Sequence, residues 1–480
     1  MAITERGKKD ACGVFGISNP RHDIVGNIYY GLMSLQHRGQ EAAGISVIKN
    51  GKITSRRVWG LVSQNLKPKL WRFTGHVGIG HVRYSTTGTS TLANAQPMTD
   101  SSFAFAHNGN LSNYMHIRRK MENQGFRFRA NSDAEIILKL FRRCYERCGD
   151  YIEAFKEMSK HIEGGYSLVM LTRKRELIAA RDPYGLRPLC QGRGDGSVAF
   201  ASESVALDSN NMELVGDVKP GTVMIANEDS CEEHRYVPCQ RKAHCMFEYV
   251  YFSRVDSILE GRSVYDVRFN LGINLAKTYD LKPDVVIPVP DTSRTAAEGY
   301  SSYTGAPVAE GLIKNRYVHR TFIMPRQKDR DSAMKLKLNP LKSVVAGNEV
   351  LIIDDSIVRG TTSKAIVQMV RKAGAKEVHM MSTCPPIISP CFYGIDIATY
   401  SELIAAKMSL DDIRIKIEAD SLCYQTLGGL INAIGLQKED LCMGCLRNEY
   451  PTTYAQRILE MMKEKTETDS VRLWETELAT

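Results

Sequence analysis

Short apolar runs separated by glycine-containing turns fill roughly the first half of the chain. Each run has the length of a strand and is rich in β-branched or aromatic residues. The runs span residues 13–17, 43–48, 77–82 and 166–171. Amphipathic helices are expected at 111–123 and 133–148. This mixture predicts an α+β domain with antiparallel sheets.

The pattern changes near residue 240. Apolar strands followed by amphipathic helices now predominate, and strands are expected at 284–289, 350–353 and 377–381. Between the last two, apolar residues recur at helical spacing from Ile366 to Ala373, and Gly374 is a suitable helix stop. A strand, a crossover helix and a second strand form a βαβ unit, so this half predicts a parallel α/β sheet.

Length and composition fit a folded protein of two or three domains. The chain has 480 residues, of which 43% are hydrophobic and 24% charged. No apolar run approaches the roughly 18 residues of a membrane span. The first eleven residues are mostly polar and have no apolar core of a secretory signal. We therefore expect a cytoplasmic protein with no membrane partner.

The net charge of +9 is compatible with a nucleic acid or with an acidic small substrate. Lysines and arginines gather between Lys314 and Lys342, but no nucleic-acid-binding motif accompanies them. A site for a polyanionic small molecule is the better interpretation. No nucleic acid partner is expected.

Twelve cysteines are too few for a disulfide scaffold in a chain of this length. Cys12 lies at the start of the first predicted strand, and taken alone it is best interpreted as a buried structural thiol. Cys442 and Cys445 form one C-x-x-C pair, which by spacing alone fits a redox pair, half a zinc site or chance.

Several motifs accompany Cys12 in order. They are Asp10–Gly16 (DACGVFG), Leu35–Gly44 (LQHRGQEAAG), Gly80–Gly88 (GHVRYSTTG), Ala106–Asn110 (AHNGN) and Asn131–Glu135 (NSDAE). Together they resemble the class II glutamine amidotransferases. The resemblance implies a glutaminase domain with the N-terminal-nucleophile fold, an αββα sandwich.

The resemblance also implies a role for each matched residue. Removal of residues 1–11 would give Cys12 a free α-amino group, with a pKa near 8, to act as the base for its own thiol. Arg83 would bind the α-carboxylate of glutamine and Asp133 its α-ammonium group. Asn108 and Gly109 would form the oxyanion hole. Without their companions, Arg83 and Asp133 would be interpreted as a surface ion pair.

A second motif follows the strand at 350–353. It continues through two acids and a hydroxyl-rich turn to Thr362, and ligands of parallel sheets bind at such strand ends. Paired acids here are often only solvated turn formers. All thirteen residues, VLIIDDSIVRGTT, resemble the phosphoribosyl diphosphate (PRPP) motif of type I phosphoribosyltransferases.

This second resemblance assigns the PRPP site. Asp354 and Asp355 would bind the ribose hydroxyls, and the turn at 290–293 the diphosphate. The 5-phosphate would be bound by Ser356, Arg359, Gly360, Thr361 and Thr362. One Mg²⁺ per subunit would be held near Thr292, Asp354 and Asp355. The basic stretch from Lys314 to Lys337 resembles a loop that closes over PRPP.

Both halves together resemble the glutamine phosphoribosylpyrophosphate amidotransferases, in the branch that has a propeptide and an iron–sulfur cluster. The implied ligands of one [4Fe–4S] cluster per subunit are Cys245, Cys391, Cys442 and Cys445, with a Cys₄ zinc site as the alternative. The implied domains are a propeptide 1–11, a glutaminase domain 12–240, a phosphoribosyltransferase domain 241–465 with C-terminal helices, and a tail 466–480.

The family implies the function. The chain is expected to make 5-phosphoribosylamine from PRPP and glutamine, the first committed step of purine synthesis, as a homo-oligomer (a homotetramer by resemblance) inhibited by purine nucleotides. The alternative is a PRPP- or nucleotide-sensing regulator with a non-catalytic phosphoribosyltransferase fold. A glutaminase coupled to another acceptor is a third possibility, which the PRPP motif disfavours.

Overall fold

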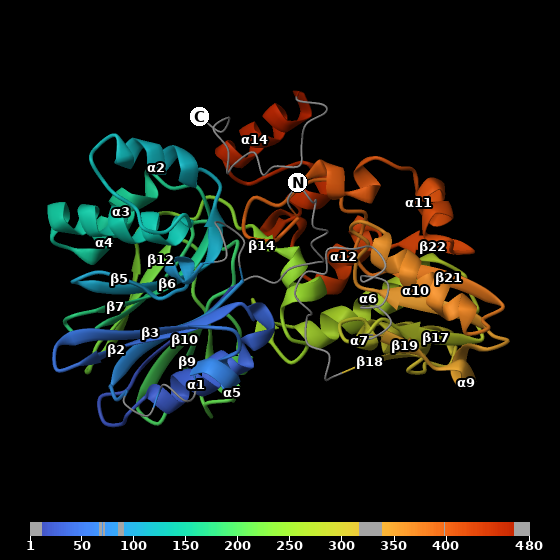
Figure 1. Ribbon diagram of the computed structural model, residues 1–480, viewed down its shortest axis with the longest axis horizontal. Helices are drawn as coiled ribbons and strands as arrows, with labels where there is room; N and C mark the ends of the chain where they lie inside the picture. Colours follow the sequence, from blue (N-terminus) through green and yellow to red (C-terminus); the bar gives the residue numbers. More distant parts are fainter. Residues whose placement is uncertain are drawn as a thin grey trace.

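The computed structural model describes residues 12–66, 70, 73–84, 91–315, 338–397 and 399–464. Three predictions therefore lie outside the described residues: the propeptide 1–11, most of the closing loop and the tail 466–480. The described chain forms two bodies side by side along the long axis, with helix α14 (Thr453–Glu464) above their junction (Figure 1).

Two antiparallel sheets form the centre of the N-terminal body. One has the order β11-β9-β10-β1-β4-β2-β3 and the other β13-β12-β8-β7-β6-β5. The first sheet comprises β1 (Gly13–Ser18), β2 (Ala42–Lys49), β3 (Lys52–Trp59), β4 (Val77–Arg83), β9 (Cys190–Gly194), β10 (Ser197–Ala201) and β11 (Glu213–Asp217). The second comprises β5 (Met98–Thr99), β6 (Phe103–Leu111), β7 (Gly164–Thr172), β8 (Leu177–Arg181), β12 (Thr222–Ala226) and β13 (Cys231–Arg235).

Helices cover the outer face of each sheet. Helices α1 (Val25–Ser34) and α5 (Val205–Asp208) pack on the first sheet, and α2 (Tyr114–Glu122), α3 (Asp133–Cys148) and α4 (Tyr151–Ser159) on the second. Apolar residues of both sheets, such as Val14 and Val169, form the core between them. The four layers are visible in Figure 1, and they confirm the predicted αββα sandwich. Because both faces of its sheet are covered, β1 is buried at every position.

Several predicted strand ends differ by one or two residues, and one helix start differs by more. The helix expected from residue 111 begins at Tyr114, because β6 continues to Leu111 and pairs it with Gly164 of β7. The helix expected at 133–148 matches α3 in full.

A parallel sheet with the order β17-β20-β21-β22 forms the C-terminal body. The strands are β17 (Val285–Pro288), β20 (Glu349–Asp354), β21 (Glu377–Ser382) and β22 (Ser421–Tyr424). Alternate residues of β20 face opposite ways: Ile352 packs with α10 (Thr361–Lys372) and α11 (Leu410–Ile417), whereas Ile353 packs with α6 (Val264–Thr278) and α7 (Arg294–Thr304). Helix α10 joins β20 to β21 in parallel, which confirms the predicted βαβ unit and α/β fold.

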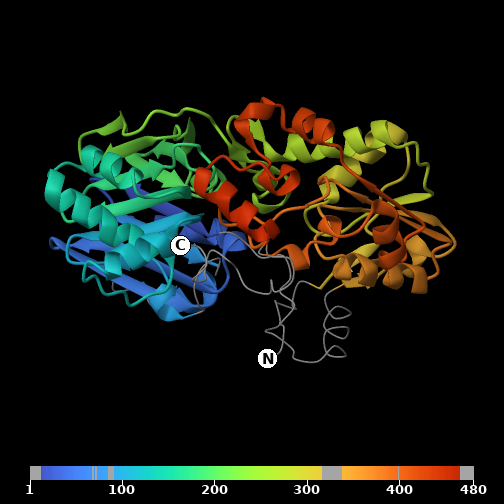
Figure 2. The same cartoon turned by 90° about the horizontal axis from the view of Figure 1, so that it is seen from above.

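Shorter elements complete this body and its junction with the first. They are the helical turn η5 (Glu248–Phe252), the strands β14 (His244–Cys245), β15 (Ile258–Leu259), β16 (Arg262–Ser263), β18 (Leu312–Lys314), β19 (Leu338–Pro340) and β23 (Leu441–Cys442), and the helices α9 (Lys342–Val345), α12 (Leu427–Ile434) and α13 (Gly444–Arg447). The last helix, α14, returns to the N-terminal body, where Ile458 and Leu459 join the apolar core beneath α3 and the backbone N–H of Tyr454 donates to Glu163 at 2.8 Å. The view from above shows the same crossing (Figure 2).

No described helix combines the length and the apolar character that crossing a bilayer requires.

Helices α6 and α7 approach closely through two glycines, and this contact gives a first prediction. A Cβ on Gly272 would lie 1.9 Å from the Ala296 carbonyl oxygen, and one on Gly299 would lie 2.0 Å from that of Phe269. We expect Gly272→Ala to lower the free energy of unfolding by about 1–3 kcal/mol, because the helices must separate. Urea denaturation followed by circular dichroism measures this.

The matched control is Gly428→Ala in α12. Gly428 is exposed, and a Cβ there would meet no atom within 4 Å. Alanine should raise helix stability there by up to about 1 kcal/mol. Equal effects of the two substitutions would contradict the close-packing argument.

Candidate active site

Cys12 lies where strand β1 begins, beside the end of strand β4. Its Sγ donates to the Tyr84 carbonyl at 3.3 Å, and the side chain is buried. Burial raises the pKa of the Cys12 thiol, the Tyr84 contact and Arg83 lower it, and Asp133 and Glu41 raise it. The structure therefore brings Cys12, Arg83 and Asp133 into one electrostatic neighbourhood, as the motifs predict. A thiol with a raised pKa needs a base before it can act as a nucleophile.

Arg83 and Asp133 are both buried rather than on the surface. Arg83 donates to Glu41 at 2.8 Å, so the ion-pair interpretation is correct in part, although the partner is Glu41. A guanidinium carries five donors, so pairing with Glu41 is compatible with binding a second carboxylate. Asp133, the first residue of α3, accepts from the backbone of Leu111 at 3.0 Å and lies 3.3 Å from His107 Nε2.

Asn108 and Gly109 lie side by side on strand β6. The amide nitrogen Nδ2 of Asn108 is buried without a hydrogen-bond partner among the described residues. Gly109 has φ +144°, and a Cβ there would lie 2.0 Å from the Gly165 carbonyl oxygen. A buried donor without an acceptor is costly, so it marks a place where a ligand oxygen can bind.

Sequence reasoning missed a buried network of four charged residues that surrounds this site. The Nε of Arg38 donates to the Cys12 carbonyl at 3.0 Å. Its terminal nitrogens contact Glu203 at 2.5 Å and Glu248 at 2.7 Å. Arg187 contacts Glu248 at 2.8 Å. Arg38 lies in a quoted motif, but no pattern in the sequence pairs it with acids about 165 and 210 residues away.

The network joins the two bodies. Glu248 comes from η5 of the C-terminal body, while the other three residues belong to the N-terminal body. Burial would raise the pKa of Glu248, but Arg38 and Arg187 hold it below its usual value. The two arginines therefore keep the carboxylate charged in its buried position.

The residues predicted for PRPP line one cavity of 690 Å³ at the carboxyl ends of β17 and β20. Those that line it are Thr292, Asp354, Asp355, Ser356, Arg359, Gly360, Thr361 and Thr362. Asp355 accepts from Thr292 and from Ser356, each at 2.7 Å. The cavity ends at the first turn of α10, whose unpaired N–H groups favour a phosphate.

Gly360 caps α10 with φ +75°, and a Cβ there would lie 2.7 Å from Ile404. Glycine is therefore required for the close turn that leads into the helix. Arg359 forms an ion pair with Glu402, which also lines the cavity. Lys314, at the start of the predicted closing loop, contacts Asp291 at 2.6 Å.

Three further residues contribute to this cavity, and none of them was assigned to it from the sequence. Arg268 is buried, donates to the carbonyls of Tyr249 and Ser253, and faces Asp355. Burial lowers the pKa of Arg268 to about 10, and Asp355 opposes this shift. His37 and Gln40 reach the cavity from the N-terminal body.

The donor set of the proposed magnesium site consists of oxygen atoms, which fits Mg²⁺. Thr292, Asp354 and Asp355 all line the cavity. Among the described residues, one other group, Glu349, Glu377 and His379, has three candidate ligand atoms within 4.8 Å of one another. It lies at the start of β20 and β21, away from the PRPP cavity.

The four predicted cysteine ligands line one small cavity at the junction of the two bodies. Strands β14 and β23 pair in parallel and place Cys245 opposite Cys442. The backbone N–H groups of Ile388 and Ser389 donate to the Cys445 carbonyl, which brings the Cys391 loop to the same place. All four thiols are free, and burial raises the pKa of each, for Cys245 to about 12.

The spacing of these sulfurs bears on what they hold. In a zinc site with Zn–S bonds of about 2.3 Å, neighbouring sulfurs lie about 3.8 Å apart. In the described chain, no three of the four sulfurs lie within 4.8 Å of one another.

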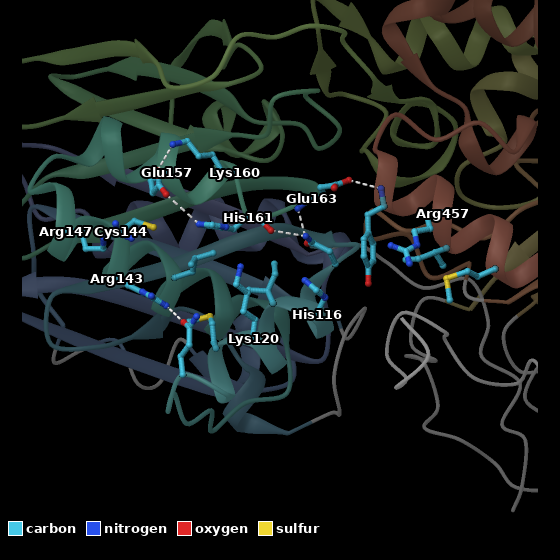
Figure 3. A pocket seen from close by; sticks show the side chains of 18 residues that line it. His116, Lys120, Arg143, Cys144, Arg147, Glu157, Lys160, His161, Glu163 and Arg457 are labelled. Atoms are coloured by element: carbon cyan, nitrogen blue, oxygen red, sulfur yellow. Dashed lines mark hydrogen bonds and ion pairs between the residues drawn. The ribbon is translucent and has the colours of Figure 1, made fainter. Parts of the chain in front are cut away.

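A separate cavity of 570 Å³ lies on the N-terminal body between α2, α3, α4 and α14 (Figure 3). Basic side chains line it, including Lys120, Arg143 and Arg457. Glu157 offsets part of this charge through Lys160 at 2.6 Å and His161 at 3.7 Å. None of the predicted site residues lines this cavity, so the candidate chemistry lies elsewhere.

Two family models match the chain: a glutamine amidotransferase domain over residues 81–209 and a phosphoribosyl transferase domain over residues 254–388. The amidophosphoribosyltransferase of Methanothermobacter thermautotrophicus is 46% identical over 95% of this chain and 98% of its own length. That of Bacillus subtilis is 41% identical over 97% and 99%. The solved glutamine phosphoribosylpyrophosphate amidotransferase from B. subtilis, complexed with ADP and GMP, superimposes with a TM-score of 0.85 at 41% identity, covering 92% of this chain and 97% of that one.

The Arg38–Glu203 pair predicts that the free energy of unfolding depends on pH. Burial alone would raise the pKa of Glu203, but His37 and Arg38 lower it far below its usual value. The unfolded value is about 4.3, so the stabilisation is present above that pH and is lost as pH falls below it. We expect Glu203→Gln to lower the free energy of unfolding at pH 7 by about 3–5 kcal/mol, because Arg38 loses a buried partner.

Urea denaturation at pH 7 and at about pH 3 measures this, and the difference between wild type and variant should shrink at the lower pH. Glu228→Gln is the control, since Glu228 forms an exposed pair with Arg175 and should cost at most about 1 kcal/mol. A pH-independent effect of Glu203→Gln would refute the charge argument.

Proposed function

The chain belongs to the amidophosphoribosyltransferase family, and from that premise we propose which of its residues carry out each half of the reaction. The enzyme converts PRPP, glutamine and water to 5-phosphoribosylamine, glutamate and diphosphate, the first committed step of purine synthesis. The observation that carries the coupling of two sites is the turn η1 (Gln36–Arg38): Arg38 binds the Cys12 carbonyl, whereas His37 lines the PRPP cavity.

In the first half-reaction, the Cys12 thiolate attacks the side-chain amide carbon of glutamine. Arg83 binds the α-carboxylate of the substrate and Asp133 its α-ammonium group. The developing oxyanion accepts from Nδ2 of Asn108 and from the backbone N–H of Gly109. Ammonia leaves, and water then releases glutamate from the thioester. The buried Nδ2 without a partner supports this assignment.

Removal of residues 1–11 would supply the base. In the full chain the nitrogen of Cys12 is a peptide nitrogen, whereas after cleavage it is an amine with a pKa near 8. Such an amine can take the thiol proton near neutral pH, which the raised pKa of the buried thiol requires. The nucleophile and the base are then one residue.

In the second half-reaction, ammonia passes inside the protein to C1 of PRPP. Asp354 and Asp355 bind the ribose hydroxyls, the turn from Ser356 to Thr362 binds the 5-phosphate, and residues 290–293 bind the diphosphate. Mg²⁺ near Thr292 and the two acids would offset charge on the leaving diphosphate. Basic residues of the loop that begins at Lys314 add to this and exclude water from the oxocarbenium-like ribose.

The remaining assignments follow the family. Cys245, Cys391, Cys442 and Cys445 hold a [4Fe–4S] cluster, whose four thiolate ligands the cavity can provide. The protein acts in the cytoplasm as a homotetramer, and purine nucleotides inhibit it. The B. subtilis relative complexed with ADP and GMP supports nucleotide binding. A non-catalytic sensor would have no use for the buried thiol site.

Cys12→Ala separates the two half-reactions. Glutamine-dependent product formation should fall by roughly 10⁴-fold or more, because the nucleophile is lost. Synthesis from PRPP and high ammonia should remain, since the PRPP cavity is unchanged. A coupled assay of 5-phosphoribosylamine with each nitrogen donor measures both. Cys148→Ala, which removes an exposed thiol, is the control, and equal loss of both activities would reject the two-site assignment.

The double variant Asp354→Ala and Asp355→Ala should remove transfer from either nitrogen donor. The ribose hydroxyls lose their acceptors, so we expect PRPP affinity to fall at least about 100-fold by calorimetry. Asp411→Ala, an exposed acid outside the cavity, should bind PRPP normally. Unchanged affinity in the double variant would refute the loop assignment.

Protein purified without oxygen should be brown, absorb broadly near 400 nm and contain about four irons per chain. Cys442→Ser should lose the colour and most of the iron, whereas Cys423→Ser, outside the cavity, should retain both. A colourless protein with one zinc per chain would reject the cluster and leave the enzymatic assignment intact.

A further inference from the structure

Arg187 follows strand β8 and is fully buried, and its three guanidinium nitrogens are not equally paired. Nη2 contacts Glu248 at 2.8 Å and donates to Asn108 Oδ1 at 3.3 Å. Nε and Nη1 are buried and have no hydrogen-bond partner among the described residues. An uncompensated buried donor is destabilising, so this residue needs a further acceptor.

The contact with Asn108 fixes which way the side-chain amide points. A guanidinium can only donate, so the atom of Asn108 that faces Arg187 must be the oxygen. The nitrogen Nδ2 is then directed away from Arg187, where it has no partner in the described chain. Arg187 thus orients the group that serves as the oxyanion donor.

The cysteine cavity lies on the other side of the same residue. Arg187 lines that cavity together with Cys245 and Cys391, and its charge lowers the pKa of both thiols against the effect of burial. Sulfur atoms bound to a metal are hydrogen-bond acceptors, and donors around them tune such a site.

A second contact joins the cysteine loop to the same strand. Asn110 donates to the Phe392 carbonyl at 2.9 Å, directly after Cys391. Gly394 lies so close to Gly109 that a Cβ on it would be 3.1 Å from the Gly109 carbonyl carbon. The segment that carries Cys391 therefore packs against the strand that carries Asn108 and Gly109.

We propose that Arg187 is a positioning residue that connects the cysteine site to the glutaminase: it orients Asn108 through Nη2 and donates from Nε and Nη1 to sulfur atoms of the group held by the four cysteines. This inference rests on the proposed roles of Asn108 and of the cysteines. Arg187 does not touch the substrate. Its effect on glutamine hydrolysis passes through Asn108.

A double-mutant cycle on the full-length enzyme tests the first part. Asn108→Ala should lower kcat for glutamine hydrolysis roughly 100- to 1,000-fold, as removal of an oxyanion donor does. Arg187→Met should lower it by roughly 10-fold or more with little change in KM, and should have less than about a threefold effect when Asn108 is already alanine. Ammonia-dependent synthesis should fall far less than glutamine hydrolysis in all three variants, since neither Arg187 nor Asn108 lines the PRPP cavity.

Arg181→Met is the matched control: Arg181 is another buried arginine, which contacts Glu260 and the backbone carbonyls of Arg187 and Val218 but not the Asn108 side chain. The fold losses in kcat caused by Arg181→Met and by Asn108→Ala should multiply in the double variant, as they do for independent residues. Multiplicative losses for Arg187→Met as well would overturn the proposal. No loss in Asn108→Ala would instead reject the oxyanion assignment itself. If Arg187→Met fails to fold, Arg187→Lys gives the same cycle, since lysine keeps the charge but loses the fork of donors.

The second part has a readout that does not depend on activity. In Arg187→Met, the reduction potential of the anaerobically purified protein should shift to a more negative value than in wild type and in Arg181→Met, because positive donors near the sulfurs are lost. An unchanged potential and visible spectrum would overturn the contact with the cysteine site and leave the cycle result standing.

Discussion

The arrangement of both sites depends on four buried charges, those of Arg38, Arg187, Glu203 and Glu248. None of them is compatible with a buried position alone, because the desolvation of a single charge costs several kcal/mol. Each is tolerated only when opposite charges meet it in good geometry. Glu248 comes from the C-terminal body, so the network is complete only when the two bodies dock in one register. A small rotation between them would leave an arginine in the N-terminal body unpaired.

The same network contacts two residues that are assigned to glutamine hydrolysis. Arg38 binds the carbonyl of Cys12, and Arg187 binds the amide of Asn108. Ser253 donates to Glu248 at 2.8 Å, and its own carbonyl accepts from Arg268, which faces Asp355 in the PRPP cavity. Hydrogen bonds and ion pairs therefore extend from the backbone of Cys12 to Arg268, which lines the PRPP cavity and interacts electrostatically with Asp355. Buried polar contacts of this kind are suited to transmit a change at one site to the other.

The cysteine cavity adds a constraint on chain topology. Cys245 and Cys442 are neighbours only because the two-residue strands β14 and β23 pair. Pairing these strands closes a loop of roughly 200 residues, which has a substantial entropic cost. Two paired residues contribute little free energy to offset that cost. A group bound by all four cysteines would hold the C-terminal segment, including α14, against the N-terminal body. The cavity therefore links the last helix of the chain to the sheet that carries Asn108.

The sequence by itself determined the two fold classes and most element positions, and its motifs predicted residues for both sites. Helix α3 and strand β20 could be read from periodicity, and Asp354 to Thr362 could be read as a ligand loop, because a strand, a turn and a helix start are local features. Tertiary structure alone decided which charges meet. Arg187 and Arg268 lie in no motif with a visible function. Arg187 contacts Asn108 and Glu248, and Arg268 interacts electrostatically with Asp355. A contact between residues far apart in sequence depends on how two folded bodies dock, and neither periodicity nor spacing along the chain encodes that geometry.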